Sequence, residues 1–127
     1  DPGQIGGPSG GLVFTLQIYD QLTGDKLSRG RNISGTGTMN ANGYVGEIGG
    51  IDKKVMAAKA AGSTVFFAPY VAPNAEILKY EEKHQTNYQL ARQTAKKYAP
   101  NVKVVPVRTF DDAVNYLETG KIIQTVN

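Results

Sequence analysis

The chain has 127 residues, the length of one domain, and 40% of them are hydrophobic while 20% are charged. It has no cysteine, which excludes a disulfide scaffold, a thiol nucleophile and a zinc or iron–sulfur site built on thiolates. The net charge of +3 comes from 14 Lys and Arg and 11 Asp and Glu. These charges are interspersed along the chain, so nothing in the pattern favours nucleic-acid binding.

The two ends and the apolar runs also limit the class of protein. Every apolar run is far shorter than the ~18 residues that indicate a membrane span. The first eleven residues have neither the basic nor the apolar region of a signal peptide. Because the chain starts at Asp1 without a Met, we expect it to be a piece of a longer protein.

The N-terminal half predicts a loop, a helix and a hairpin. Residues 1–11 contain five Gly and two Pro, which indicates a loop. Residues 12–22 are apolar on nearly every side of a helical wheel, which predicts a buried rather than amphipathic helix ending at Thr23 and Gly24. Further on, the turn sequence Asn-Ala-Asn-Gly separates residues 31–39 from residues 44–48, which predicts a β-hairpin.

The remaining chain alternates helices and strands. An Ala- and Lys-rich helix is expected over residues 51–61, and a β-rich run over residues 64–68 ends at Pro69. Residues 74–98 indicate one or two helices, and residues 102–107 a buried strand. A last helix over residues 110–117 has Asp111 and Asp112 in its first turn. This alternation predicts a single α/β domain.

One hydroxyl stands where the glycine-rich loop meets the first helix. Ser9 lies within Gly-Gly-Pro-Ser-Gly-Gly, directly before the predicted helix. The first amides of a helix lack intrahelical acceptors and carry partial positive charge, so they stabilise an oxygen that becomes negative. Glycines beside it allow a substrate backbone to approach. Ser9 could instead be an ordinary N-cap. A phosphate-binding loop is a further alternative, but its Gly-Lys-Ser/Thr ending is missing.

A serine nucleophile needs a base, and two residue types are available. His84 is the only histidine, but it lies in a strongly polar stretch, so a Ser-His-Asp triad is unattractive. A lysine acts as a base only when neutral, which requires its pKa to fall from about 10.4 to roughly 7–8. Apolar surroundings produce such a fall. The question is therefore which lysine has an apolar setting.

Lys54 is the lysine with that setting. At 100° per residue it lies between Ala58 and Ala61, inside the apolar stripe of the predicted helix. Asp52 and Lys59 fall on the opposite, wet side. The alternative is a lysine whose stem covers alanines while its amine reaches solvent.

Three motifs in this order resemble the proteolytic domain of Lon-family proteases. They are Gly-Pro-Ser-Gly-Gly at residues 7–11, Thr36 followed by Gly, and Gly-Glu-Ile-Gly-Gly-Ile-Asp-Lys-Lys-Val at residues 46–55. That family uses a Ser/Lys dyad. The resemblance implies Ser9 as the nucleophile and Lys54 as the base, with Lys53 a non-catalytic neighbour. Thr36 would orient the lysine, and the backbone N–H groups of Ser9 and Gly10 would bind the oxyanion.

The resemblance also implies a fold, with some departures. We expect one Lon-type α/β proteolytic domain over residues 1–127, with short mixed strands and about four helices. Gly10 stands where relatives usually have Ala, and Gly6 where many have Asp, so no carboxylate role is carried over. The family's domain normally has strands upstream of the glycine loop, and we expect these to be missing from this chain.

The sequences of residues 18–22 and 105–113 most resemble those of the ATP-independent, PDZ-linked Lon-like proteases of Gram-positive bacteria. That resemblance implies a membrane anchor and a PDZ domain before this one, on the extracytoplasmic face. We expect a peptide or protein substrate, no nucleic acid, no cofactor and no metal, and a homo-oligomer stays open. Residues 70–98 are either a substrate-facing flap or scaffold. The alternative function is a non-catalytic module that binds an anion or peptide at the glycine loop.

Overall fold

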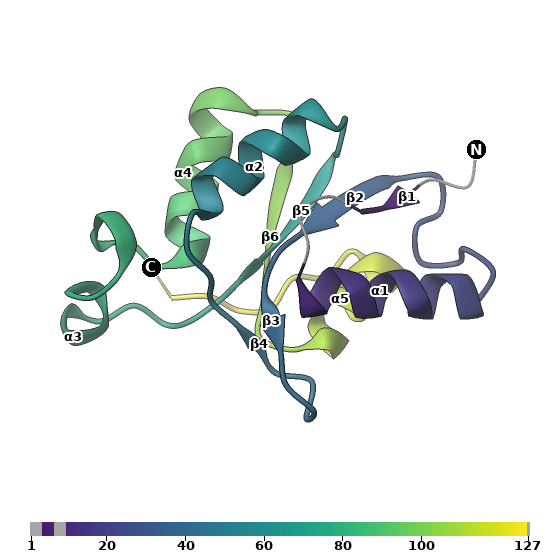
Figure 1. Cartoon of the computed structure of the whole chain (residues 1–127), viewed down its shortest axis with the longest axis horizontal. Coiled ribbons are helices and arrows are strands. Elements are labelled where there is room, and N and C mark those ends of the chain that lie inside the picture. The colour runs from purple at the N-terminus through teal and green to yellow at the C-terminus, as the bar shows by residue number, and fades with distance from the viewer. Residues whose placement is uncertain (1–3, 7–9, 127) are drawn as a thin grey trace.

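A parallel four-stranded sheet forms the centre of the computed structural model, which describes residues 4–6 and 10–126 (Figure 1). Its strand order is β1-β2-β5-β6. The strands are β1 (Gln4–Ile5), β2 (Asn32–Gly35), β5 (Val65–Pro69) and β6 (Lys103–Val107). All five residues of β5 are buried, because this inner strand is covered on both faces. Its sequence, Val-Phe-Phe-Ala-Pro, is correspondingly a continuous apolar run.

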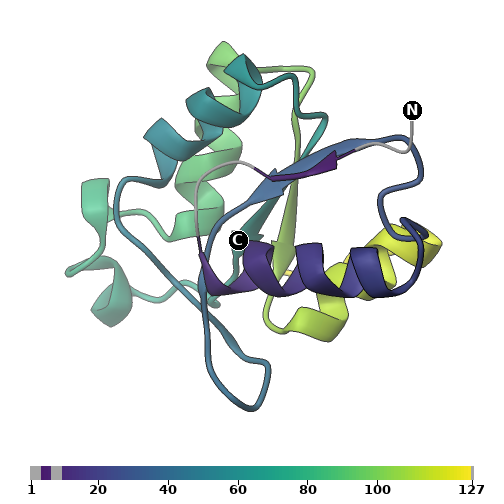
Figure 2. The ribbon, with the colours of Figure 1, turned by 45° about the vertical axis from the view of Figure 1, so that its right-hand side comes forward.

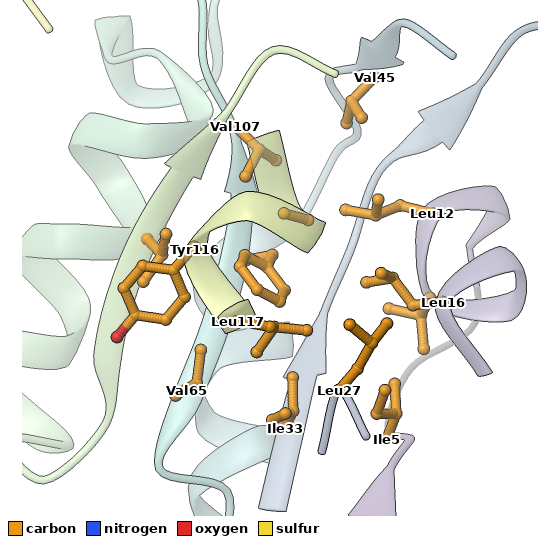
Figure 3. Packing of buried hydrophobic residues seen from close by; sticks show 14 residues of the cluster. Ile5, Leu12, Leu16, Leu27, Ile33, Val45, Val65, Val107, Tyr116 and Leu117 are labelled. Carbon is orange, nitrogen blue, oxygen red and sulfur yellow. The ribbon is translucent and has the colours of Figure 1, made fainter. Parts of the chain in front are cut away.

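Helices cover both faces of this sheet (Figure 2). On one face lie α1 (Gly11–Leu22) and α5 (Phe110–Thr119), and on the other α2 (Ile51–Ala60) and α4 (Asn87–Tyr98). Because side chains alternate along a strand, Phe67 joins the α1/α5 core and Phe66 the α2/α4 core. Figure 3 shows the first of these cores, where Leu12 and Leu16 of α1 face Ile33 and Leu117.

Smaller elements complete the fold. Two short strands, β3 (Thr38–Met39) and β4 (Val45–Gly46), lie between β2 and α2 in the sequence and pair with each other in antiparallel orientation. A short helix α3 (Ala75–Leu78) and a 3-10 turn η1 (Glu82–His84) precede α4. Thr86 starts α4 with a capping box, in which its hydroxyl accepts from Gln89 N while the Gln89 side chain accepts from Thr86 N.

The α/β class and most elements confirm the expectations from sequence, but the predicted burial of the first helix is wrong. Only one stripe of α1, including Leu12 and Leu16, is buried, whereas Phe14 is 64% exposed and Leu22 81% exposed. The reason is that α1 contacts the sheet along one side, and no second layer covers its outer side within the described part of the chain. The helix α1 is therefore apolar on two sides, and only one of them is buried, while the other exposes Phe14, Ile18 and Leu22.

Two further expectations are corrected by strand pairing. Residues 4 and 5, expected in a loop, form β1 because Gln4 and Ile5 pair in parallel with Asn32 and Ile33. The expected hairpin is restricted to β3 and β4, since β2 pairs with β1 and β5 instead. The described residues contain five α-helices, of which α3 is a single turn, in agreement with the expected number of about four. None of these helices is long and apolar enough to cross a membrane.

Candidate functional site

The N-terminus of α1 lies against the turn that follows β2. Ser9 lies outside the described residues, but its neighbour Gly10 is the N-cap of α1, in extended conformation. The Leu12 N–H donates to the Gly37 carbonyl at 3.3 Å. A Cβ at position 10 would lie 2.8 Å from the Gly37 oxygen, so the two backbones are in direct contact. The structure therefore brings the residue after Ser9 to the residue after Thr36.

Gly37 makes this approach possible. Its φ of 140° is one that residues with a side chain rarely adopt, and a Cβ there would lie 2.6 Å from Val45 Cγ1. The same Cβ would lie 3.2 Å from Pro69 Cγ. Glycine is thus required where the chain leaves β2 and turns towards β3.

Thr36 is buried beside this turn with its hydroxyl unused. Its N–H donates to the Phe67 carbonyl at 3.0 Å, which continues the pairing of β2 with β5 by one residue. Since Ile33 belongs to the α1/α5 core, alternation places Ser34 and Thr36 on the α2/α4 face. Thr36 is 1% exposed, and neither its Oγ1 nor the Ser34 Oγ has a hydrogen-bond partner among the described residues. A buried hydroxyl without a partner is costly, which makes it a candidate for a functional contact.

Lys54 comes from the first turns of α2, which packs on β2. Val55 and Ala58 are fully buried, Lys54 is half-buried, and Lys53 is exposed. The side chain of Lys54 therefore leaves the helix at the edge of its buried stripe, on the side that the helical wheel predicts. Within residues 4–6 and 10–126 this side chain forms neither a hydrogen bond nor an ion pair. No carboxylate of the described chain lies within ion-pair distance of its amine.

Lys83, unlike Lys54, forms an ion pair with a carboxylate. Lys83 Nζ lies 3.1 Å from Asp52 Oδ2, and this hydrogen bond is the main cause that lowers the pKa of Asp52. Asp52 lies in the first turn of α2, where the partial positive charge of the helix end also favours a carboxylate. This ion pair joins Lys83 to Asp52 and does not include Lys54.

Glu47, on the connection that leads into α2, interacts with Glu81, which directly precedes η1. Glu47 accepts a hydrogen bond from Asn87 N at 2.7 Å, at the start of α4. Burial, a hydrogen bond with Glu47 and the charge of Glu47 together raise the pKa of Glu81 to about 8. The Glu81 carboxyl therefore carries a proton near neutral pH.

His84 takes no part in this arrangement as far as the described residues show. It is exposed in the turn η1, and its Nδ1 lies 3.2 Å from the Leu78 carbonyl oxygen. No group of three or more His, Asp or Glu side chains suited to a metal ion occurs in the part of the chain that the structure describes.

Sequence reasoning missed two residues that hold the connection into α2, namely Glu47 and Asn87. The signal for Asn87 was present, because Thr86 and Gln89 have capping-box spacing and mark the start of a helix at position 87. Nothing in the sequence indicates that the Asn87 side chain reaches back to residue 48.

Two comparisons with known proteins bear on this site. The family model of the Lon protease (S16) C-terminal proteolytic domain matches residues 4–104. A Lon protease of Mycolicibacterium smegmatis is 38% identical over 63 residues, which are 50% of this chain and 8% of that protein. The chain thus spans only a small part of the curated relative that it matches.

The close approach of Gly10 to Gly37 makes Gly10→Ala destabilising. The added methyl would meet a backbone oxygen at 2.8 Å, so we expect a loss of about 1–3 kcal/mol in the free energy of unfolding, measured in urea. Gly6→Ala is the control, because its nearest neighbour would lie at 3.5 Å. Equal stability of the two variants would contradict the contact.

The raised pKa of Glu81 predicts a fall in stability with rising pH. The folded protein keeps a proton on Glu81 up to about pH 8, whereas the unfolded chain loses it near 4.5. The free energy of unfolding therefore decreases across this window. Allowing for solvent screening of a partly exposed group, we expect about 1–3 kcal/mol.

The measurement compares urea unfolding of the natural chain, Glu81→Gln and Glu76→Gln at several pH values between 4.5 and 9. Glu81→Gln should lose less stability with rising pH than the natural chain. Glu76→Gln removes an exposed carboxylate paired with Lys79 and should follow the natural chain. Parallel curves for Glu81→Gln and the natural chain would contradict the raised pKa of Glu81.

Proposed function

We propose that this chain, which belongs to the family of Lon protease (S16) C-terminal proteolytic domains, is an endopeptidase with a Ser9/Lys54 dyad. The family is one of serine peptidases. The observation that carries the assignment of residues is the contact of Gly10 with Gly37, beside the buried and unpartnered Thr36 hydroxyl. It supports a site formed by the start of α1, the end of β2 and the first turns of α2.

The proposed reaction uses Lys54 as the proton acceptor. The neutral amine of Lys54 takes the proton of Ser9 Oγ, and the oxygen attacks the carbonyl carbon of the scissile peptide. The tetrahedral oxyanion is stabilised by backbone N–H groups of Ser9 and Gly10, about 3 kcal/mol for each donor. The lysine returns the proton to the leaving amine. Water then hydrolyses the acyl-enzyme on Ser9 by the same proton path.

Thr36 has the role of orienting the lysine. Its Oγ1 is buried, has no partner among the described residues, and belongs to the sheet face on which α2 packs. As an acceptor it would fix one N–H of the Lys54 amine and direct the lone pair of the nitrogen towards Ser9. This role explains why the fold leaves a hydroxyl unpaired in the core.

The substrate would bind as an extended strand. Backbone pairing with a sheet edge recognises a peptide without dependence on one side chain. Val45 N of β4 already donates to the Arg108 carbonyl at 2.8 Å, so the edge of β3 is the better candidate for substrate. We propose peptides or unfolded protein segments as substrates, with neither nucleic acid nor metal involved.

The subtype of Lon-like protease is a property of the whole protein, of which this chain is one domain. The resemblance of residues 18–22 and 105–113 supports an ATP-independent enzyme that is anchored in a membrane and carries a PDZ domain before this one. Peptide cleavage that is unchanged by added ATP and magnesium would support this subtype, and cleavage that requires ATP would contradict it.

Replacing Lys54 by Arg tests the dyad. Guanidinium keeps the positive charge but is not deprotonated in proteins, so Lys54→Arg should reduce peptide cleavage at least ~10³-fold, as Ser9→Ala should. Lys53→Arg is the matched control and should remain active, since Lys53 is exposed. Cleavage of a peptide mixture is measured by mass spectrometry from pH 6 to 10, where the rate should rise as the lysine loses its proton.

Full activity of Lys54→Arg would overturn the dyad. Anion binding without any cleavage by a folded natural chain would favour the non-catalytic module instead.

Thr36→Val tests the orienting hydroxyl with an isosteric change. Since Oγ1 has no partner in the described protein, its loss should leave the unfolding free energy unchanged or raised. The rate constant kcat should fall about 10–100-fold, the value of one hydrogen bond to a charged or reacting amine. Ser34→Ala, which removes the other unpartnered hydroxyl on the same face, should keep kcat. Equal effects of both changes on kcat would remove the specific role of Thr36.

A further inference from the structure

The connection that leads into the lysine-bearing helix is bound to the start of α4 by hydrogen bonds of Asn87. The Ile48 N–H donates to Asn87 Oδ1 at 2.8 Å, and Asn87 Nδ2 donates to the Ile48 carbonyl at 2.9 Å. The amide of Asn87 thus pairs with both polar groups of Ile48, as a neighbouring strand would. A third bond, from Asn87 N to Glu47 Oε2 at 2.7 Å, joins the same two segments.

Asn87 is itself held firmly. It is 5% exposed and is the first residue of α4, directly after the N-cap Thr86 and within the capping box that Thr86 forms with Gln89. The helix α4 packs on α2, with Ala91 and Ala58 fully buried in their shared core. Asn87 therefore presents its amide from a buried helix end, and the connection into α2 is hydrogen-bonded to it.

The position of Ile48 affects Lys54 through Gly49 and Gly50, the two residues between Ile48 and the first residue of α2. Gly50 is the N-cap of α2, in the left-handed conformation with φ of 70° and without a side-chain cap. Its carbonyl accepts the first bonds of the helix, from Lys53 N at 3.1 Å and Lys54 N at 3.3 Å. The position of residues 48–50 thus sets the point and the angle at which the turn bearing Lys54 begins.

We propose that Asn87 is a positioning residue for the Ser9/Lys54 reaction, because its side-chain amide holds Ile48 and thereby fixes the start of α2 and the place of the Lys54 amine. The inference rests on the proposed function for its catalytic part. It gives residues 70–98, whose role the sequence leaves open, a specific task at residue 87. Misplacement of a catalytic group by about 1 Å is enough to reduce a rate about 100-fold.

The contact requires an amide. Ile48 offers one donor and one acceptor, and only a side chain with both an oxygen and an N–H group in one plane satisfies both. Asn87→Asp keeps the acceptor, loses the donor to the Ile48 carbonyl, and brings a second carboxylate to Glu47. Asn87→Ala leaves both polar groups of Ile48 without this partner.

The experiment compares Asn87→Ala with Ala95→Gly, a change in the interior of the same helix that touches neither Ile48 nor Gly50. Ala95 is 4% exposed, so glycine there weakens α4 and serves as the control for general destabilisation. We measure Tm together with kcat and KM for one cleaved peptide. For Asn87→Ala we expect kcat to fall about 10–100-fold with KM within about threefold of the natural value.

Ala95→Gly should keep kcat within about threefold of the natural value despite a comparable fall in Tm. A natural kcat in Asn87→Ala, or an equal loss in both variants, would overturn the positioning role.

Amide hydrogen exchange separates this inference from the proposed function. In Asn87→Ala the amides of Lys53 and Lys54 should exchange faster than in the natural chain, while Ala95→Gly leaves them unchanged. Unchanged exchange in Asn87→Ala would refute the positioning of α2 whether or not the chain cleaves peptides. Absence of cleavage by the natural chain, with faster exchange in Asn87→Ala, would refute the protease assignment and leave the structural role of Asn87 supported.

Discussion

The contact between the backbones of Gly10 and Gly37 is the constraint on which the site depends. The start of α1 lies against the turn after β2 at a separation that leaves no room for a methyl group on Gly10, and a Cβ on Gly37 would collide with Val45 Cγ1 inside the turn. The nucleophile proposed for this chain precedes one of these glycines, and the threonine proposed to orient the base precedes the other. The geometry of the site thus follows from two residues that have no side chain.

The third part of the proposed site is the helix α2, which packs on the sheet face opposite to α1. The helix α2 carries Lys54 at the margin of its buried stripe, without a carboxylate partner among the described residues, while Asp52 takes Lys83 instead. The buried, unpartnered Thr36 hydroxyl lies on the same face, and the two features become intelligible together if the hydroxyl binds the amine.

Much of this arrangement was predictable because it depends on local chemistry. The helix end at Gly62 follows from a pattern within ten or so residues, and the structure has it, whereas Lys54, predicted inside the apolar stripe, lies half-buried at the edge of the buried stripe. The exposed outer side of α1 was not predictable, since apolar periodicity does not say which sides another layer will cover. The tie between Asn87 and Ile48 was equally hidden, because it joins residues 39 positions apart through a side chain. Ser9 lies outside the described residues, so its role stays a prediction from the sequence.

The most direct measurement is the site of acylation. The chain is mixed with an activated peptide ester, quenched within the first turnover, digested and mapped by mass spectrometry. The account predicts one acyl group on Ser9, formed in the natural chain and in Lys53→Arg but not in Lys54→Arg. Acylation of Ser9 that proceeds equally well in Lys54→Arg, or an acyl group on another residue, would contradict it.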